Sequence, residues 1–143
     1  MLISTKGRYA LRLLVDLAEH QTDGYVPLKE IASRQEISEK YLESIIKVLV
    51  RDGILTGLRG KGGGYRLSRS PDQLSVYRVL KVMEDSLSPV SCLEDNAAPC
   101  ARMSECRTLS LWEGLDRVIS EYLSRYTISD LMQTGQPGND YII

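Results

Sequence analysis

Three stretches near the start of the chain carry apolar residues at helical spacing, and they predict helices over residues 6–20, 27–35 and 38–51. Thr5 is the expected N-cap of the first helix and Ser38 that of the third, because both hydroxyls can accept a backbone hydrogen bond. Gly53 follows the third helix and suits the left-handed conformation in which many helices end. The short turn at residues 35–37 predicts a helix-turn-helix.

The period then changes, and alternating apolar residues predict two short strands over residues 54–59 and 65–68. Between them lies the run Gly60-Lys61-Gly62-Gly63-Gly64, which is typical of a flexible hairpin tip. A helix-turn-helix followed by such a hairpin predicts a winged helix.

Helical spacing returns in the second half of the chain, over residues 74–84, 106–126 and 129–132. Cys106 is therefore expected to open the longest helix. Residues 85–104 contain two prolines and few periodic apolar positions, which predicts a loop. Residues 134–143 are expected to form a mobile tail. The predicted fold class is mainly α.

The composition excludes several functional classes. Apolar residues make up 43% of the 143 residues and charged residues 26%, as in a globular domain. No apolar run approaches the ~20 residues of a membrane span, and the first residues lack the apolar core of a signal peptide. We therefore expect a cytoplasmic protein with no membrane partner. His20 is the single histidine, which argues against a catalytic triad or a zinc hydrolase, and so against an enzyme.

The net charge of −1 conceals an uneven distribution. Residues 1–84 hold 14 Lys and Arg against 10 Asp and Glu, whereas residues 85–143 hold 4 against 9. A basic first part and an acidic second part fit a DNA-binding head joined to an effector or dimer region. An ordinary solvated surface is the alternative explanation of the charge alone.

A winged helix predicts which side chains meet double-stranded DNA. Residues at the start of the second helix of the motif face the major groove, where hydroxyls and lysines suit phosphates and a glutamate can accept from cytosine. A glycine-rich wing allows close approach, and an arginine beside it can enter a narrow minor groove. The candidate DNA contacts are Lys6, Arg8, Ser38, Lys40, Tyr41, Glu43, Lys47, Arg59, Lys61 and Gly62.

Cys92, Cys100 and Cys106 lie close together in the sequence, with the spacing Cys-x7-Cys-x5-Cys and no CxxC pair. A structural zinc site commonly needs four ligands and closely spaced cysteine pairs, so the spacing disfavours zinc. Three thiolates on a loop can hold an iron–sulfur cluster if a further ligand or an exposed iron completes it. Two alternatives stay open: thiols that are merely buried or reactive, and a thiol redox switch.

Three motifs resemble those of the Rrf family of bacterial winged-helix regulators, which includes the IscR, NsrR, RirA and CymR types. They are Ser4-Thr5-Lys6-Gly7-Arg8-Tyr9-Ala10, Ile37-Ser38-Glu39-Lys40-Tyr41-Leu42-Glu43 and Arg59-Gly60-Lys61-Gly62-Gly63-Gly64-Tyr65. The resemblance covers residues 1–132, and the three cysteines fall where the cluster-binding members carry theirs. It implies a homodimer with crossing C-terminal helices, a cluster near the dimer interface, and DNA binding that changes with cluster state. It also implies that Tyr41, Glu43 and Arg59 read DNA.

The chain departs from the family pattern at the remaining cluster ligand. The IscR type has a histidine three residues after its last cysteine, where this chain has Leu109. The NsrR type has an aspartate near the N-terminus, where this chain has Arg8. The fourth ligand is left open between local carboxylates, water and a small thiol, and both [2Fe–2S] and [4Fe–4S] clusters remain open. The local carboxylates are Glu94, Asp95 and Glu105.

The chain ends in Tyr141, Ile142 and Ile143. This ending resembles the tails of CymR-type regulators and serine acetyltransferases, which insert into the active site of cysteine synthase. Backbone donors and an apolar pocket can capture such a terminal carboxylate and side chain. A chance apolar finish to a polar tail is the alternative.

These observations predict a winged helix-turn-helix over residues 1–84, a cysteine-bearing sensor loop over 85–104, a dimerisation helix and short terminal helix over 105–133, and a flexible tail over 134–143. The predicted function is a dimeric DNA-binding regulator, a repressor or an activator, whose affinity for DNA is tuned by the cluster and which controls genes for iron–sulfur cluster assembly, iron or sulfur metabolism. One alternative is a CymR-like regulator of cysteine metabolism that needs no metal. A small redox enzyme or electron carrier is a second alternative, disfavoured by the DNA-binding head and the missing CxxC motif.

Overall fold

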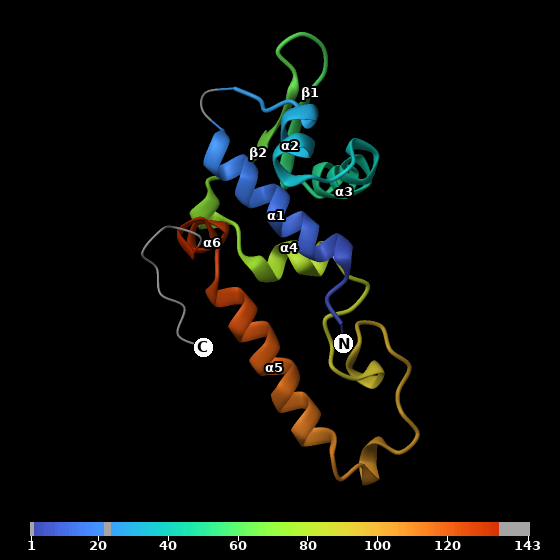
Figure 1. Cartoon of the computed structure of the whole chain (residues 1–143). Coiled ribbons are helices and arrows are strands. Elements are labelled where there is room, and N and C mark those ends of the chain that lie inside the picture. The colour runs from blue at the N-terminus through green and yellow to red at the C-terminus, as the bar shows by residue number, and fades with distance from the viewer. Residues whose placement is uncertain (1, 22–23, 135–143) are drawn as a thin grey trace.

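Helices dominate the computed structural model, which describes residues 2–21 and 24–134 (Figure 1). The helices are α1 (Thr5–His20), α2 (Leu28–Gln35), α3 (Glu39–Arg51), α4 (Val76–Met83), α5 (Leu109–Arg125) and α6 (Ile128–Thr134). The strands are β1 (Leu55–Leu58) and β2 (Gly64–Leu67), and the short 3-10 turns are η1 (Pro71–Gln73), η2 (Ser91–Leu93) and η3 (Met103–Glu105). The predicted fold class, mainly α with a small hairpin wing, is confirmed.

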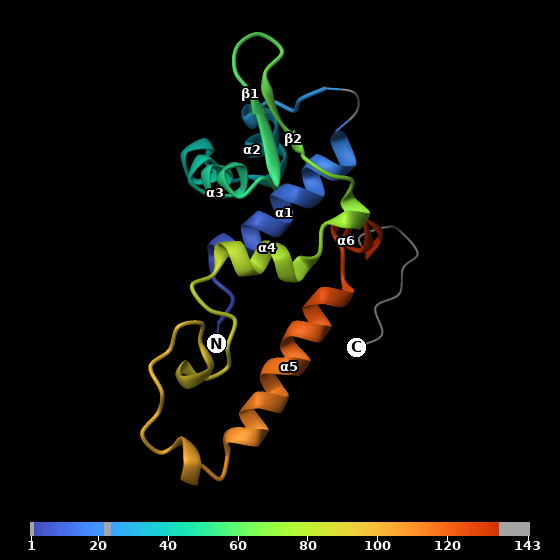
Figure 2. The same cartoon turned by 180° about the vertical axis from the view of Figure 1, so that it is seen from behind.

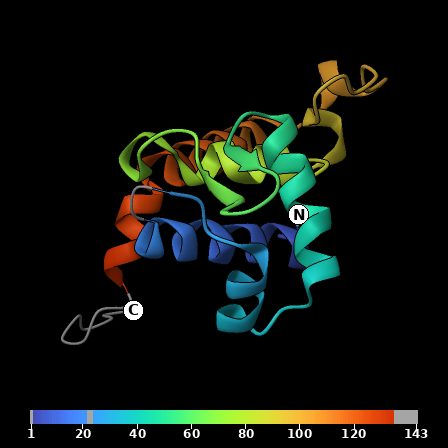
Figure 3. The ribbon, with the colours of Figure 1, turned by 90° about the horizontal axis from the view of Figure 1, so that it is seen from above.

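The core of the head forms around α1, which runs between α2 and α4 (Figure 3). Leu13, Leu14 and Leu17 are fully buried on α1, and Leu42 and Ile45 of α3 meet them in the same core. Removal of these apolar side chains from water is the main force that holds the three helices together. The core fixes where α3 and the wing stand relative to α1.

The wing is an antiparallel hairpin in which Leu55 pairs with Leu67 and Thr56 with Arg66. Tyr65 also pairs with Val26, through two backbone hydrogen bonds of 2.9 Å, and this bridge anchors the wing to the segment before α2. Gly64 makes the bridge possible, because a Cβ at this position would lie 2.2 Å from the Val26 carbonyl oxygen. The base of the wing is therefore fixed, while residues 59–63 project from the head as a loop (Figure 1).

Beyond α4 the chain leaves the head and returns to it. Residues 85–108 descend to the far end of α5, and α5 leads back to the head and α6 (Figure 2). The return is fixed by two backbone hydrogen bonds of 2.9 Å, from Val76 N–H to Tyr126 O and from Ile128 N–H to Leu74 O. Ile128 is fully buried in the same core as α1. Nowhere in residues 2–21 and 24–134 is there a helix long and apolar enough to cross a membrane.

Two predicted helix starts are wrong. Ser4, not Thr5, caps α1, because the Ser4 Oγ accepts a hydrogen bond from Gly7 N–H at 3.0 Å. Cys106 does not open the long helix, which begins at Leu109 after the turn η3. The predicted Ser38 cap and the left-handed Gly53, with a φ of 76°, are confirmed.

Candidate DNA interface and cysteine segment

The turn between α2 and α3 is closed by local hydrogen bonds. Glu36 adopts a left-handed φ of 55°, and the N–H of the buried Ile37 donates to Ala32 O at 3.1 Å. Ser38 then caps α3, because its Oγ accepts from Tyr41 N–H at 3.1 Å. These contacts fix the angle at which α3 leaves α2, as a helix-turn-helix requires.

The sequence of α3 divides the helix into two faces. Leu42, Ile45, Ile46 and Leu49 face the core and are buried. Lys40, Glu43 and Lys47 are exposed, and their spacing of three and four residues places them in one row along the helix. Ser38 is exposed at the start of this row. The structure therefore presents four of the predicted DNA contacts on the solvent face of α3.

Tyr41, by contrast, is half-buried and held by α1. The rings of Tyr9 and Tyr41 meet edge to face, with centroids 5.7 Å apart and planes at 88°. The Arg12 guanidinium lies 5.0 Å from the centre of the Tyr9 ring, and it also donates to Gln35 O at 2.6 Å. Tyr9 and Arg12 thus position the first turn of α3, a role that the sequence analysis did not assign to them.

A groove of about 450 Å³ lies between α3 and the wing. Glu43 and Lys47 line it from α3, and Arg59 and Tyr65 line it from the wing. The groove brings together three predicted DNA contacts that are separated by up to sixteen positions in the sequence. The remaining two wing candidates, Lys61 and Gly62, are exposed farther out on the hairpin tip.

Lys6 and Arg8 are exposed in the first two turns of α1 and are not among the residues that line the groove. Arg8 Nη2 donates to Thr5 Oγ1 at 3.1 Å. Because Tyr9 contacts Tyr41, this end of α1 adjoins the start of α3 (Figure 1). All ten candidates are thus accessible at least in part, and their contacts with DNA remain predictions.

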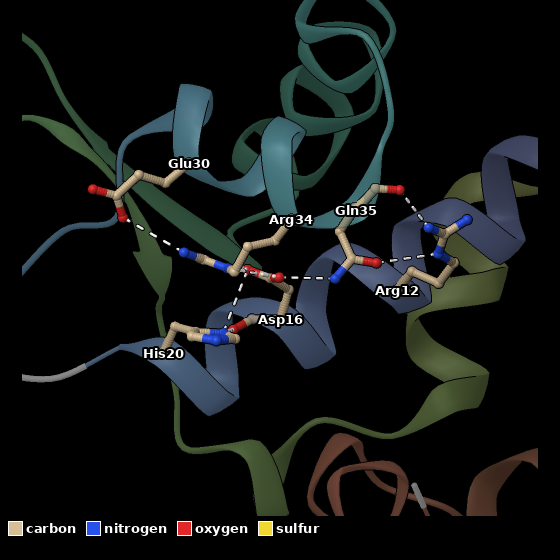
Figure 4. A network of polar contacts seen from close by, with 6 residues as sticks. All are labelled: Arg12, Asp16, His20, Glu30, Arg34 and Gln35. Atoms are coloured by element: carbon tan, nitrogen blue, oxygen red, sulfur yellow. Dashed lines mark hydrogen bonds and ion pairs between the residues drawn. The ribbon is translucent and has the colours of Figure 1, made fainter.

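A network of polar contacts joins α1 to α2 (Figure 4). The Asp16 side chain is almost fully buried, and its Oδ1 accepts from Arg34 Nη2 at 2.7 Å. Asp16 Oδ2 accepts from Arg34 Nε at 3.1 Å and from Gln35 Nε2 at 2.8 Å. The exposed His20, at the end of α1, contacts the Asp16 carbonyl oxygen through Nδ1 at 2.8 Å. The carboxylate therefore holds the end of α2 against α1.

Burial opposes ionisation of Asp16 and by itself raises its pKa, but hydrogen bonds from Arg34 and Gln35 and the charge of Arg34 outweigh that effect. The pKa of Asp16 is consequently lower than its ordinary value. This network was not predicted from the sequence, although the sequence carries one signal of it. Asp16 lies within the apolar stripe of α1, between Leu13 and Leu17, where an acidic residue needs a buried partner.

The three cysteines are free thiols on the segment between α4 and α5. Cys92 lies in η2 and is half-buried, whereas Cys100 and Cys106 are exposed. Within the described part of the chain, no three Cys, His, Asp or Glu side chains are grouped closely enough to hold a metal ion. The turns η2 and η3 lie well apart along the segment (Figures 1 and 2). Binding of one cluster by all three thiols therefore requires the segment to rearrange.

Hydrogen bonds to Cys106 and Asp95 are already formed in this arrangement. Cys106 Sγ lies 3.6 Å from Thr108 Oγ1, and this contact, with backbone N–H groups, lowers the pKa of the Cys106 thiol. Asp95, one of the possible further ligands, accepts a hydrogen bond from Lys81 of α4, which raises the pKa of Lys81. Asp95 thus links the cysteine segment to α4.

One face of α5 is apolar and exposed. Leu111, Leu115, Val118 and Tyr122 follow one another at spacings of four, three and four residues, and their exposed fractions run from 40% to 61%. Val118 and Tyr122 also line an apolar hollow of about 260 Å³ together with Ile3. A row of large apolar side chains that water reaches is typical of a surface that another protein covers. The tail residues Tyr141, Ile142 and Ile143 lie outside the described residues.

A helix-turn-helix with a two-stranded wing, followed by a long helix with an exposed apolar face, defines the class of winged-helix transcriptional regulators. Residues 3–134 match the family model described as "Rrf2: Iron-dependent Transcriptional regulator". The chain belongs to this family.

Individual relatives agree with the family model. Protein rrf2 of Nitratidesulfovibrio vulgaris is 38% identical over 133 residues, which cover 93% of this chain and 88% of that protein. The regulator IscR of Aliivibrio salmonicida is 36% identical over 132 residues, 92% of this chain and 77% of that protein. The structure of CymR, the global cysteine regulator of B. subtilis, superposes with a TM-score of 0.76 and 34% identity, covering 95% and 99% of the two chains.

These comparisons confirm the predicted family. The relatives are transcriptional regulators and not enzymes. The comparisons therefore also confirm that this protein is a DNA-binding transcriptional regulator and not an enzyme.

Proposed function

We propose that this protein is a homodimeric regulator whose affinity for DNA is set by an iron–sulfur cluster bound through Cys92, Cys100 and Cys106. The DNA-binding part of the proposal rests chiefly on the groove in which Glu43 and Lys47 of α3 face Arg59 of the wing. Its target genes serve iron–sulfur cluster assembly, or iron or sulfur metabolism, and it acts in the cytoplasm. The division of the chain into head, sensor loop, dimerisation helix and tail is part of the proposal.

Each predicted DNA contact has a chemical role in this proposal. Exposed cations bind backbone phosphates by their charge, and these contacts set the register of the protein on the duplex. They carry no sequence information, because the phosphates are the same at every base pair. Glu43 accepts from a base amino group in the major groove, beside Tyr41. Arg59 enters the minor groove, and Gly62 lets the wing approach the backbone. The phosphate contacts are assigned to Lys6, Arg8, Ser38, Lys40, Lys47 and Lys61.

The donor set of the cysteine segment fits an iron–sulfur cluster. Three thiols lie on one irregular segment, none is paired in a disulfide, and two are exposed. When bound, such a cluster would join the three thiolates, and its presence would depend on the supply of iron and on oxidation. The residues between Cys92 and Cys106 change their course when the thiolates converge, and this change carries the signal towards the head. Glu94, Asp95 and Glu105 remain the candidates within the chain for a further ligand.

A second copy of the chain completes the proposed regulator. The exposed apolar row on α5 packs against its counterpart in the partner, so that two heads meet two half-sites on one duplex. Such an isologous pairing removes this apolar row from water in both copies at once. The cysteine segment begins at the base of α4 and ends at the start of α5, so its course affects how the two heads are aligned.

Anaerobic purification of the full chain tests the cluster. We expect a brown protein with iron and sulfide in comparable amounts, and a visible absorption band that each single Cys→Ala change removes. Ser104→Ala, on the same segment, is the matched control and keeps the colour. A colourless protein that takes up no iron during reconstitution contradicts the proposal, whatever its activity on DNA.

An electrophoretic shift on the promoter region of the protein's own gene tests DNA binding separately. We expect retarded DNA with the wild-type chain, and weaker binding when Arg59 or Lys47 is changed to Ala. Comparison of the cluster-loaded and cluster-free forms then measures the coupling. Equal affinity of the two forms shows that the cluster does not control DNA binding.

One set of observations favours a metal-free alternative. The three thiols are apart in this structure, Leu109 stands where the IscR type has a histidine, and the fold is similar to that of CymR. In this alternative the C-terminal residues Tyr141, Ile142 and Ile143 bind a cysteine synthase. Deletion of Ile143 should then abolish association of the two purified proteins, whereas the three Cys→Ala changes should leave it intact. Unchanged association after the deletion removes the tail from consideration.

A further inference from the structure

The base of the wing carries a second hollow, of about 490 Å³, on the face turned away from α3. Side chains alternate along a strand, and the register pairs Thr56 with Arg66 but Gly57 with Tyr65. Gly57 and Tyr65 line the groove towards α3, whereas Thr56 and Arg66 line the second hollow. The two cavities thus lie on opposite faces of the hairpin, and the second is not part of the proposed DNA groove.

The polar lining of this hollow consists entirely of groups that can donate hydrogen bonds. Two arginines, three hydroxyls and one amide surround it, and none of the lining residues is acidic. They are Arg66, Arg69, Thr56, Ser68, Ser70 and Gln21. Such a set, with two permanent positive charges, is complementary to an oxyanion.

Several walls of the hollow are fixed before any ligand binds. The Arg66 guanidinium lies 4.8 Å from the centre of the Tyr25 ring, and Gln21 Oε1 accepts from Leu67 N–H at 2.9 Å. The hydroxyls of Thr56 and Ser68 lie 2.8 Å apart, and the Ser70 hydroxyl donates to the Asp72 carboxylate. A ligand that meets this surface does not have to order it.

Arg69, the other lining cation, has no such contact with any residue in the described part of the chain. Among the residues that the structure describes, none forms a hydrogen bond, ion pair or ring contact with its exposed guanidinium. Within the described part of the chain its donors are therefore free, and it lines the same hollow as Arg66, whose position is set by Tyr25. Two guanidinium groups that line one hollow can bind a tetrahedral anion from two sides.

We propose that this hollow is a phosphate-binding site, separate from the groove that meets the recognised DNA sequence. Arg66 and Arg69 bind the phosphate oxygens. Of the two hydrogen-bonded hydroxyls of Ser68 and Thr56, the one that accepts from the other donates its own proton to the same group. The phosphate belongs either to a small phosphorylated molecule or to the backbone of DNA that flanks the bound site.

Titration with inorganic phosphate tests the site directly. Backbone amide resonances of the full-length protein are followed at constant ionic strength, with chloride as the balancing anion. We expect saturable shifts confined to Thr56 and residues 66–70, and an affinity at least about tenfold lower in Arg69→Gln. Arg51→Gln, an exposed arginine outside the hollow, is the matched control. Equal affinity in the two variants, or shifts that chloride reproduces, overturns the proposal.

Two further measurements distinguish the sources of the phosphate. If Arg69→Gln leaves the affinity for promoter DNA unchanged while phosphate binding is lost, the site serves a small ligand. If the same change weakens DNA binding and lowers the salt dependence by about one phosphate contact, the site takes a backbone phosphate. Failure of the protein to bind promoter DNA contradicts the proposed function, but it leaves the phosphate titration as a valid test of this hollow.

Discussion

Glu84 Oε1 accepts two hydrogen bonds from Ser4, one from the backbone N–H and one from the hydroxyl, each 2.9 Å long. Ser4 is the N-cap of α1, and Glu84 directly follows α4. The two hydrogen bonds therefore join the start of α1 to the end of α4 across eighty residues of sequence. Glu84 also stands immediately before the cysteine segment. The start of α1, which carries Lys6 and Arg8, is thereby attached to the residue that precedes the proposed sensor loop.

Replacement of Glu84 by Ala should destabilise the protein and loosen the start of α1. The Ser4 N–H loses its acceptor in a half-buried position, for which a cost of about 1–2 kcal/mol is expected. Glu84→Gln keeps an acceptor oxygen and should cost less than Glu84→Ala. Urea unfolding measures both, and the exposed Glu94→Ala serves as control. Equal stability of Glu84→Ala and the wild type would show that the contact contributes nothing.

Gly7→Ala should be destabilising, although alanine is the better helix former. A Cβ at Gly7 would lie 2.2 Å from Glu84 Oε1 and 3.3 Å from Leu80 Cδ2. Displacement of Glu84 should lower the free energy of unfolding by about 1–3 kcal/mol. This loss exceeds the ~1 kcal/mol by which the higher helix propensity of alanine stabilises the helix. Unfolding free energies of the single and double variants with Glu84→Ala give the coupling.

In the double variant most of the penalty should disappear, because the Glu84 carboxylate is no longer there to be displaced. Gly114→Ala in α5 is the matched control, since its nearest contact, Arg117 Nη2, is 3.9 Å away. Strictly additive effects of Gly7→Ala and Glu84→Ala would contradict this explanation of the glycine.

Asp16→Asn should lower stability at pH 7 by about 1–3 kcal/mol, because Arg34 loses a charged partner but keeps some access to water. The pKa of Asp16 is lowered in the folded protein, so its ionisation contributes stability above the ordinary pKa near 3.8. That contribution is lost as the pH falls through the lower folded-state pKa. The stability difference between wild type and variant should therefore shrink in acid.

Thermal unfolding between pH 7 and pH 3 measures this trend. Glu19→Gln removes an exposed carboxylate from the same helix and is the control. If the wild type and Asp16→Asn lose stability in parallel over the whole range, the ionised carboxylate is not what holds α2 to α1.

Local signals in the sequence predicted most of the head, and long-range contacts account for the errors. The α3 boundaries followed from the Ser38 cap and Gly53, whose effects act within one turn of the helix. The α1 cap was assigned to Thr5 because the partner that favours Ser4 is Glu84, which local patterns do not reveal. The Asp16–Arg34 pair and the wing groove likewise depend on tertiary packing. The apolar spacing found α5 but placed its start three residues early, at Cys106.

DNA binding should separate residues that contact phosphates from those that read bases. Lys61→Ala should weaken binding to specific and unrelated duplexes alike, and it should reduce the slope of log affinity against log salt by about one. Glu43→Ala should relax the preference at one base pair by about 1–3 kcal/mol. Fluorescence anisotropy over a salt series measures both effects. Arg125→Ala, on α5, is the control, and an equal change of slope in this variant would contradict the assignment.

Val118→Asp should convert the proposed dimer into a monomer. Val118 is 57% exposed in the single chain, beside Ile3 and Tyr122 in the apolar hollow of about 260 Å³. In the dimer the aspartate carboxylate would be buried without a partner, and the free-energy cost would exceed the free energy gained from the apolar contact between the two copies. In the isolated chain the aspartate stays in water. The mass measured by light scattering should fall from twice 16.1 kDa to 16.1 kDa.

Glu113→Ala changes an exposed residue on the opposite side of α5 and should leave the mass unchanged. An unaltered circular dichroism spectrum in Val118→Asp excludes unfolding as the cause of a lower mass. Because two heads on one duplex bind with a high effective concentration, the monomer should also lose affinity for the promoter by at least about a hundredfold. A Val118→Asp protein that stays dimeric would show that the apolar row on α5 is not where two copies meet.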